Sequence, residues 1–230
     1  MEPTMRTARL AGFLYLLMAT LAPFTLIYIP GKLRVPGNAA ATAASIVASE
    51  SLFRLSIVGG VVAAIVFLLL VMALYRLLGG VDQGHARLMV ALVLVSVAVS
   101  FVDALTNIGA LSLFRGAEFL SALDKPQRDA LGVLFLHLHD QGDLVNEVLW
   151  GLWLFPFGLL VMRSRFLPRI LGVLLIVNGV AYVAVSLTSL LLPTYGQVVF
   201  EASMPALLGE LWIMLWLLIR GVKAPALTAS

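Results

Sequence analysis

The stretch LSIVGGVVAAIVFLLLVMALY, residues 55–75, decides the fold because it holds no charged side chain over a length that can cross a bilayer. A hydrocarbon core of ~30 Å is spanned by about 20 helical residues. Lipid offers the backbone no hydrogen-bond partner, and this stretch lacks the strict alternation of a barrel strand. The stretch is therefore expected to form a transmembrane helix.

Five more apolar stretches of similar length lie along the chain, with charged residues in the gaps between them. The six spans are expected at about 10–29, 55–75, 88–112, 143–162, 170–192 and 200–219. The first run is about 20 residues long, more than the h-region of a signal peptide, so it is expected to stay as a span. The predicted fold class is all-α: residues 1–230 form a single integral membrane domain, a polytopic bundle of six transmembrane helices.

The composition excludes several classes of protein. Hydrophobic residues make up 61% of the chain and charged residues 12%, about half the charged fraction of a soluble domain. The spans occupy most of the 230 residues, so no separate soluble catalytic domain fits. The net charge of +3 comes mainly from arginines beside the membrane, so the expected partner is the lipid bilayer and not a nucleic acid. With no cysteine, the chain has neither thiol chemistry nor disulfides.

The basic residues are unevenly distributed over the two sides of the membrane. Both termini, the second loop and the fourth loop share one side, which carries nine of the 15 Lys and Arg residues. The short turn from Arg163 to Arg169 holds three of them. The positive-inside rule therefore predicts cytoplasmic N- and C-termini in a multi-pass protein of the bacterial plasma (inner) membrane.

Polar side chains inside the spans concentrate toward the outer half of the bilayer. Such groups are costly in lipid and usually face the interior of the bundle. We therefore expect an outward-facing polar pocket for a small ligand, a cation or a proton. Its members are predicted to be Arg54, Asp103, Asn107, His139, Asp143, Glu147 and Glu210. Arg54 would supply the counter-charge, the carboxylates would accept the cation or proton, and His139 would titrate nearest neutral pH.

His139 and Asp143 also have the spacing of a two-ligand half-site for a metal ion on one face of a helix. Asp103 or Glu147 would complete the ligand set. The sequence predicts no cofactor and assigns no catalytic residue, and it leaves Zn²⁺ at His139 and Asp143 as an alternative. In that case the protein is a metal-dependent intramembrane enzyme acting on a lipid-like substrate. The opposing interpretation is an inter-helix network of hydrogen bonds and ion pairs that only fixes the bundle.

A third hypothesis is a structural subunit that binds a membrane-protein partner or a second copy of the chain. Gly59 with Ala63, and Gly60 with Ala64, have the small-xxx-small spacing that lets transmembrane helices approach closely. Neither pair by itself names the surface that it packs against.

The segments between the spans carry local structural signals. Residues 38–51 predict a capped surface helix, and Glu50 and Arg54 are spaced to form an ion pair. Residues 121–141 predict an interfacial helix, with Gly142 bending the chain into the fourth span. Pro156 is expected to interrupt the fourth span, as Pro23 interrupts the first.

Three stretches carry a resemblance to a known family: ASESLFRL at 48–55, LHDQG at 138–142, and WGLWLFPFG at 150–158 with the following RSRFLPRILG at 163–172. The chain resembles a family of uncharacterised bacterial membrane proteins, domain-of-unknown-function family 4386, over about Arg6 to Arg220. The resemblance implies a six-helix inner-membrane protein with no assigned activity. That family often has an acidic residue shortly after the Phe-Arg-Leu stretch, where this chain has Gly59 and Gly60.

Overall fold

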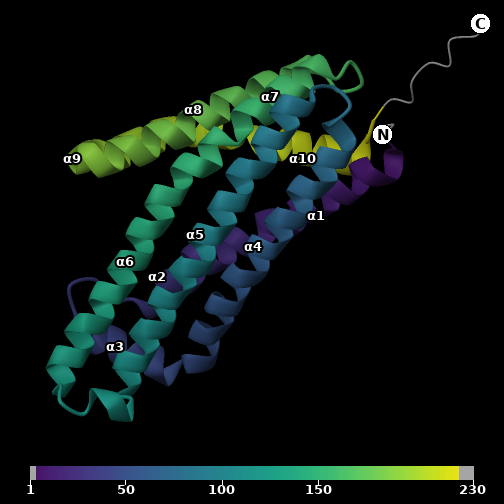
Figure 1. The fold of residues 1–230 in the computed structure, drawn as a ribbon. Coiled ribbons are helices and arrows are strands. Elements are labelled where there is room, and N and C mark those ends of the chain that lie inside the picture. Colours follow the sequence, from purple (N-terminus) through teal and green to yellow (C-terminus); the bar gives the residue numbers. More distant parts are fainter. Residues whose placement is uncertain (1–3, 223–230) are drawn as a thin grey trace, which may run out of the picture. The chain divides into compact units, whose positions relative to one another are not determined.

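The computed structural model describes residues 4–222, and helices joined by short turns make up this part of the chain (Figure 1). Six helical segments are long and apolar enough to cross a membrane, which confirms the predicted fold class. They are Met5–Leu33, Glu50–Leu78, Gln83–Arg115, Lys125–Arg163, Arg169–Leu191 and Pro193–Ile219.

The first span changes its helical geometry at the expected proline. It consists of α1 (Met5–Pro23), a π-helical turn (Phe24–Tyr28) and α2 (Ile29–Leu33). Pro23 has no N–H to continue the hydrogen-bond ladder, and the helix widens directly after it. The Thr25 hydroxyl donates to the carbonyls of Leu21 and Ala22, at 3.1 and 3.3 Å, so these groups are satisfied inside the chain.

The predicted surface helix is present before the second span. Asn38 caps α3 (Ala39–Ala48), because its side-chain oxygen accepts the backbone N–H of Ala41 at 2.9 Å. The second span is α4 (Glu50–Leu78), and the third is α5 (Gln83–Arg115). A short 3₁₀ turn (Glu118–Leu120) follows α5.

The fourth span begins far earlier than the sequence suggested. Helix α6 runs without interruption from Lys125 to Leu152, so the expected bend at Gly142 is wrong. Asp124 and Gln127 start this helix by exchanging side-chain hydrogen bonds with each other's backbone N–H groups, at 2.8 and 3.0 Å. The interruption lies at Trp153 instead, before α7 (Leu154–Arg163). Pro156 has no N–H to donate to the carbonyl oxygen four residues earlier, which belongs to Leu152, the last residue of α6.

The last two spans consist of α8 (Arg169–Leu191), α9 (Pro193–Leu207) and α10 (Gly209–Ile219). Helix α8 packs against α7, α9 and α10, and Figure 1 shows it beside α7 and α9. Glycines bring α8 close to its neighbours: a Cβ on Gly158 would lie 2.7 Å from the carbonyl oxygen of Gly172. Gly151 and Gly179 approach each other in the same way.

Two compact units divide the chain, and α1, α4, α5 and α6 contribute to both. The first unit comprises the described residues of 1–17, 66–97 and 144–230, and the second comprises residues 18–65 and 98–143. Trp153 lies in the core of the first unit, where it stacks on Phe157 and meets Phe67 edge to face. The core of the second unit includes Ile46, Phe53 and Leu136.

Candidate functional site

Within the second unit, glycines hold the antiparallel helices α5 and α6 close together. A Cβ on Gly109 of α5 would lie 2.7 Å from the ring of Phe135 on α6. The ring of Phe114 likewise lies over Gly132. At a third contact between the same two helices, the carboxylate of Asp103 on α5 lies over Gly142 on α6. This spacing brings a polar position of α5 next to the polar face of α6.

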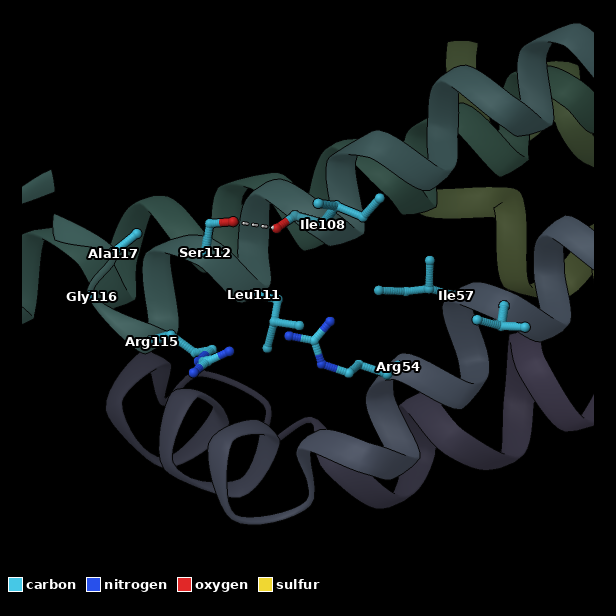
Figure 2. A pocket seen from close by; sticks show the side chains of 9 residues that line it. Arg54, Ile57, Ile108, Leu111, Ser112, Arg115, Gly116 and Ala117 are labelled. Carbon is cyan, nitrogen blue, oxygen red and sulfur yellow. Dashed lines mark hydrogen bonds between the residues drawn. The ribbon is translucent and has the colours of Figure 1, made fainter. Parts of the chain in front are cut away.

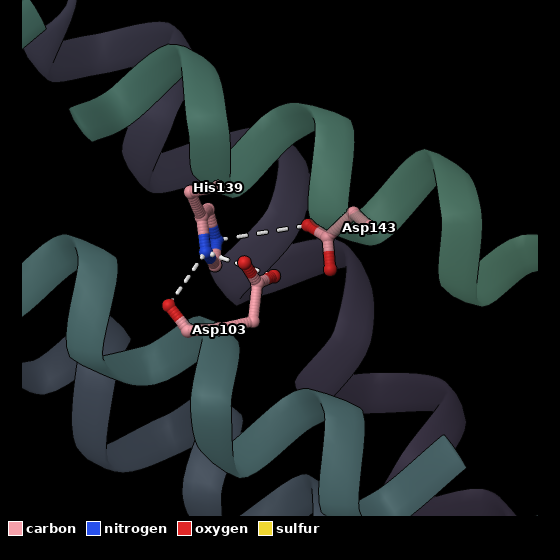
Figure 3. Close-up of side chains that lie close together, drawn as sticks. All are labelled: Asp103, His139 and Asp143. Atoms are coloured by element: carbon pink, nitrogen blue, oxygen red, sulfur yellow. Dashed lines mark hydrogen bonds and ion pairs between the residues drawn. The ribbon is translucent and has the colours of Figure 1, made fainter. Parts of the chain in front are cut away.

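Three ionisable side chains converge at this point, as Figure 3 shows: Asp103 from α5, with His139 and Asp143 from α6. His139 Nδ1 lies 3.1 Å from Asp103 Oδ2, and His139 Nε2 lies 3.6 Å from Asp143 Oδ2. The exposed fractions of the three side chains are 8%, 19% and 28% in chain order. The group is thus largely withdrawn from the surface, with Asp143 as its most accessible member.

The hydrogen bonds favour one orientation of the imidazole. Nδ1 faces two acceptors of Asp103, the carboxylate and the backbone carbonyl oxygen, the latter at 3.4 Å. An N–H on Nδ1 would donate to this pair and leave Nε2 directed at Asp143. One ligand atom from each of the three residues lies within 4.8 Å of the other two, a spacing compatible with a shared cation site.

A neighbouring ion pair occupies the next position of α6. Asp140 accepts two hydrogen bonds from the Arg34 guanidinium, at 2.7 and 2.6 Å. The sequence offered no signal for this contact, because 106 positions separate the two residues. Arg34 is therefore engaged beside the cluster of Asp103, His139 and Asp143.

Two other residues predicted for the pocket belong to the second unit. Asn107 lies one turn from Asp103 on α5 and is buried, and its side-chain oxygen has no hydrogen-bond partner among the described residues. Arg54 pairs with Glu50 at 2.7 Å, as the helical spacing predicted. Within residues 4–222, Glu50 is the carboxylate that Arg54 meets in an ion pair, so the structure does not join this arginine to Asp103.

Glu210 and Glu147 belong to the first unit. The Tyr15 hydroxyl donates to one oxygen of Glu210, and the Asn178 amide donates to the other at 3.2 Å. Tyr182 is a third hydrogen-bond partner of Glu210, and Glu147 also interacts electrostatically with this tyrosine. Sequence reasoning did not select Tyr15 or Tyr182, because a tyrosine in an apolar span has no pattern that sets it apart from a packing residue.

A further polar contact of the first unit joins α5 and α6. Trp150 Nε1 donates to the Ser96 hydroxyl at 3.1 Å, and the Asn146 amide donates to the Ser96 carbonyl oxygen at 3.3 Å. Asn146 and Ser96 are both buried. These bonds satisfy polar groups inside the apolar interior, the ordinary structural use of such residues in a span.

Comparison with protein families gives a match that covers nearly the whole chain. The family model described as Domain of unknown function (DUF4386) matches residues 10–221. No curated protein and no solved structure matches the sequence. The agreement of this match with the six spans and the all-helical fold shows that the chain is a membrane protein belonging to the DUF4386 family.

Proposed function

We propose that this integral membrane protein binds a divalent transition-metal cation, Zn²⁺ or an ion of similar ligand preference, between α5 and α6. The observation that carries the proposal is the convergence of Asp103, His139 and Asp143 from two antiparallel helices. An imidazole with two carboxylates is a ligand set for first-row transition metals, whereas Ca²⁺ and Mg²⁺ sites consist of oxygen ligands.

The charge of the cluster supports a cation in preference to a purely structural network. Two carboxylates face one imidazole, so with both carboxylates ionised the group has a net negative charge even when His139 is protonated. The nearby Arg34 is committed to Asp140. An uncompensated charge inside a span is costly, and a divalent ion would remove that cost.

The depth of the site agrees with the outward-facing pocket expected from the sequence. Asp103 lies 12 residues before Arg115, the last residue of α5, which is ~18 Å along the helix. The positive-inside distribution of arginines favours the outer side of a bacterial plasma membrane for that end of α5, with both termini in the cytoplasm. We therefore propose an external or periplasmic route for the cation.

The number of protein ligands is also compatible with a second candidate function, a metal-dependent enzyme. Asp103, His139 and Asp143 would supply three ligands to Zn²⁺, the number of protein ligands that catalytic zinc sites have. Such a site would activate water against a lipid-like substrate, which is the enzyme hypothesis. Hydrolysis of a fluorogenic lipid ester by the zinc-loaded protein, lost in Asp143→Asn, would favour the enzyme over a binding protein.

The decisive experiment is elemental analysis of detergent-purified protein, prepared without chelator or metal-affinity resin and supplied with a mixture of first-row divalent metals. The expected result is about one equivalent of one metal, lost in His139→Ala. His137→Ala is the matched control, because His137 lies two residues away on the same helix and is exposed. Equal metal contents in parent and His139→Ala would contradict the proposal, as would the absence of metal from both.

A further inference from the structure

A pocket of about 580 Å³ lies between α4 and α5 in the second unit, apart from the candidate metal site. Figure 2 shows the side chains that line it, with Arg54 and Arg115 together with Ile57, Ile108 and Leu111. Val58 also lines the pocket. The lining thus combines two guanidinium groups with an apolar wall.

The charged end of the pocket has more positive than negative groups. Arg54 Nε and Arg115 Nη1 meet the same oxygen of Glu50, at 2.7 and 3.3 Å. Each guanidinium has five N–H donors, so one shared carboxylate oxygen leaves most of them unused. Both arginine side chains are 54% exposed and therefore accessible to a ligand.

A third guanidinium lies at the edge of the same pocket. Arg128 comes within 3.1 Å of the position that a Cβ on Gly116 would occupy, and Gly116 lines the pocket. Arg128 also donates to the carbonyl oxygen of Leu123 at 3.1 Å. Gly116 has a φ of +66°, a conformation that favours glycine and ends α5 at this point.

The apolar wall extends from these arginines toward the interior of the spans. Glu50 is the first residue of α4 and Arg115 the last of α5, so the charges lie at the ends of two predicted spans, where a membrane surface is expected. Ile108 is seven residues deeper than Arg115, or ~10 Å along α5. Ile108 and Val58 are 47% and 56% exposed, so this wall faces outward and is not filled by the protein.

We propose that this pocket binds an anionic phospholipid of the outer leaflet, with its phosphate at Arg54 and Arg115 and its first acyl carbons along Ile108 and Val58. A guanidinium group binds phosphate through two parallel N–H···O hydrogen bonds. Its electrostatic attraction for an anionic lipid adds to the binding energy gained by burying the apolar acyl chain. A small soluble anion has no apolar chain that could pack against the apolar wall. The polarity of the pocket, charged at the surface and apolar with depth, matches that of a lipid molecule.

Native mass spectrometry of the detergent-purified protein tests this proposal. Dissociation constants are measured for phosphatidylglycerol and for phosphatidylcholine with identical acyl chains. Phosphatidylglycerol is expected to bind more tightly than phosphatidylcholine. In the double variant Arg54→Gln/Arg115→Gln the dissociation constant for phosphatidylglycerol is expected to rise about 25-fold, about fivefold for each arginine. Arg87→Gln is the matched control, because Arg87 is exposed at the other end of α5.

A second variant separates a lipid from a soluble anion. Val58→Trp fills the apolar part of the pocket and keeps both arginines. The affinity for phosphatidylglycerol is therefore expected to fall by at least about fivefold. Glycerol 3-phosphate, the soluble probe, is expected not to displace the lipid at millimolar concentration. Equal binding of the two lipids, an unchanged affinity in the double variant, or displacement by glycerol 3-phosphate would each overturn the proposal. Unchanged thermal unfolding of each variant shows that the comparison is made on folded protein.

Discussion

The Asp103 carboxylate lies directly over the Cα of Gly142, in the space that a side chain at position 142 would occupy. A Cβ built on Gly142 would lie 2.7 Å from Asp103 Cγ, far inside a normal contact. Glycine inside a helix is about 1 kcal/mol less favourable than alanine. Here it gives the carboxylate room to reach His139 without a break in α6.

Substitution Gly142→Ala is expected to weaken metal binding without a change of charge or of any ligand. The methyl group would push the Asp103 carboxylate away from His139, and misplaced ligands and their supports typically cost about 10- to 100-fold in metal affinity. Isothermal titration of the detergent-solubilised protein with Zn²⁺ measures the effect. Gly60→Ala is the control, since a Cβ there would meet nothing within 4 Å. Identical Zn²⁺ affinities for parent and Gly142→Ala would show that Asp103 is not a ligand.

The Glu210 cluster is expected to stabilise the first unit through its hydrogen bonds. Tyr15 and Asn178 donate to different oxygens of Glu210, so Glu210→Gln keeps the acceptor of one of them, whereas Glu210→Leu leaves both donors unsatisfied. A buried donor without a partner costs about 1–3 kcal/mol, so the leucine variant, with one more unsatisfied donor, is expected to be less stable than the glutamine variant by about that amount. Reversible unfolding from mixed micelles by sodium dodecyl sulfate gives the two free energies of unfolding.

Removing one donor provides a second measure of the same cluster. Tyr15→Phe deletes the hydroxyl that donates to Glu210 and leaves the ring in its place beside Trp153. Its destabilisation should shrink in the Glu210→Leu background, because the acceptor has already gone. Full additivity of the two changes would mean that the hydrogen bond contributes nothing to stability.

Much of the fold follows from the sequence because a helix must hold about 20 mostly apolar residues to cross a membrane, and six stretches of the chain do. The i, i+4 pairing of His139 with Asp143 and of Glu50 with Arg54 was predictable, since helix geometry alone places those side chains together. The contact of Asp103 with His139 was not, because depth in the bilayer says nothing about which helices are neighbours.

Other features depend on contacts between residues that are far apart in the sequence. Gly142 has the sequence signal of a bend, yet glycine also serves where a side chain from another helix must approach, and here the second role applies. Tyr15 and Asn178 reach Glu210 from 195 and 32 positions away. No local pattern encodes such distances.

Glycine contacts between α7 and α8 are expected to limit the stability of the first unit. A Cβ on Gly158 would lie 2.7 Å from a backbone oxygen of α8, so Gly158→Leu must push the two helices apart. Overpacking of this kind costs about 1–3 kcal/mol. The thermal unfolding midpoint in detergent is expected to fall for Gly158→Leu.

Gly60→Leu serves as the matched variant for this comparison. Position 60 has open space around it in the chain, so the midpoint should stay near that of the parent. A change of oligomeric state in Gly60→Leu, measured by light scattering, would instead favour the partner-binding hypothesis for the Gly60 and Ala64 face. Gly59 differs, because the Thr25 methyl group of the same chain already lies against it.

Outside the spans, Asp82 is expected to make stability depend on acid pH. Its carboxylate accepts the backbone N–H of His85 at 3.1 Å and also meets His85 Nδ1 and Arg163, and these contacts lower the pKa of Asp82 from its ordinary 3.8. A lowered folded-state pKa gives stability that is present above pH 3.8 and is lost as the pH falls through the folded value. Asp82→Asn keeps an N-cap acceptor and removes the charge, so its small deficit in unfolding midpoint at pH 7 should shrink as the pH falls below 3.8. A deficit of equal size at pH 7 and below pH 3.8 would assign the effect to the cap geometry and not to the carboxylate charge.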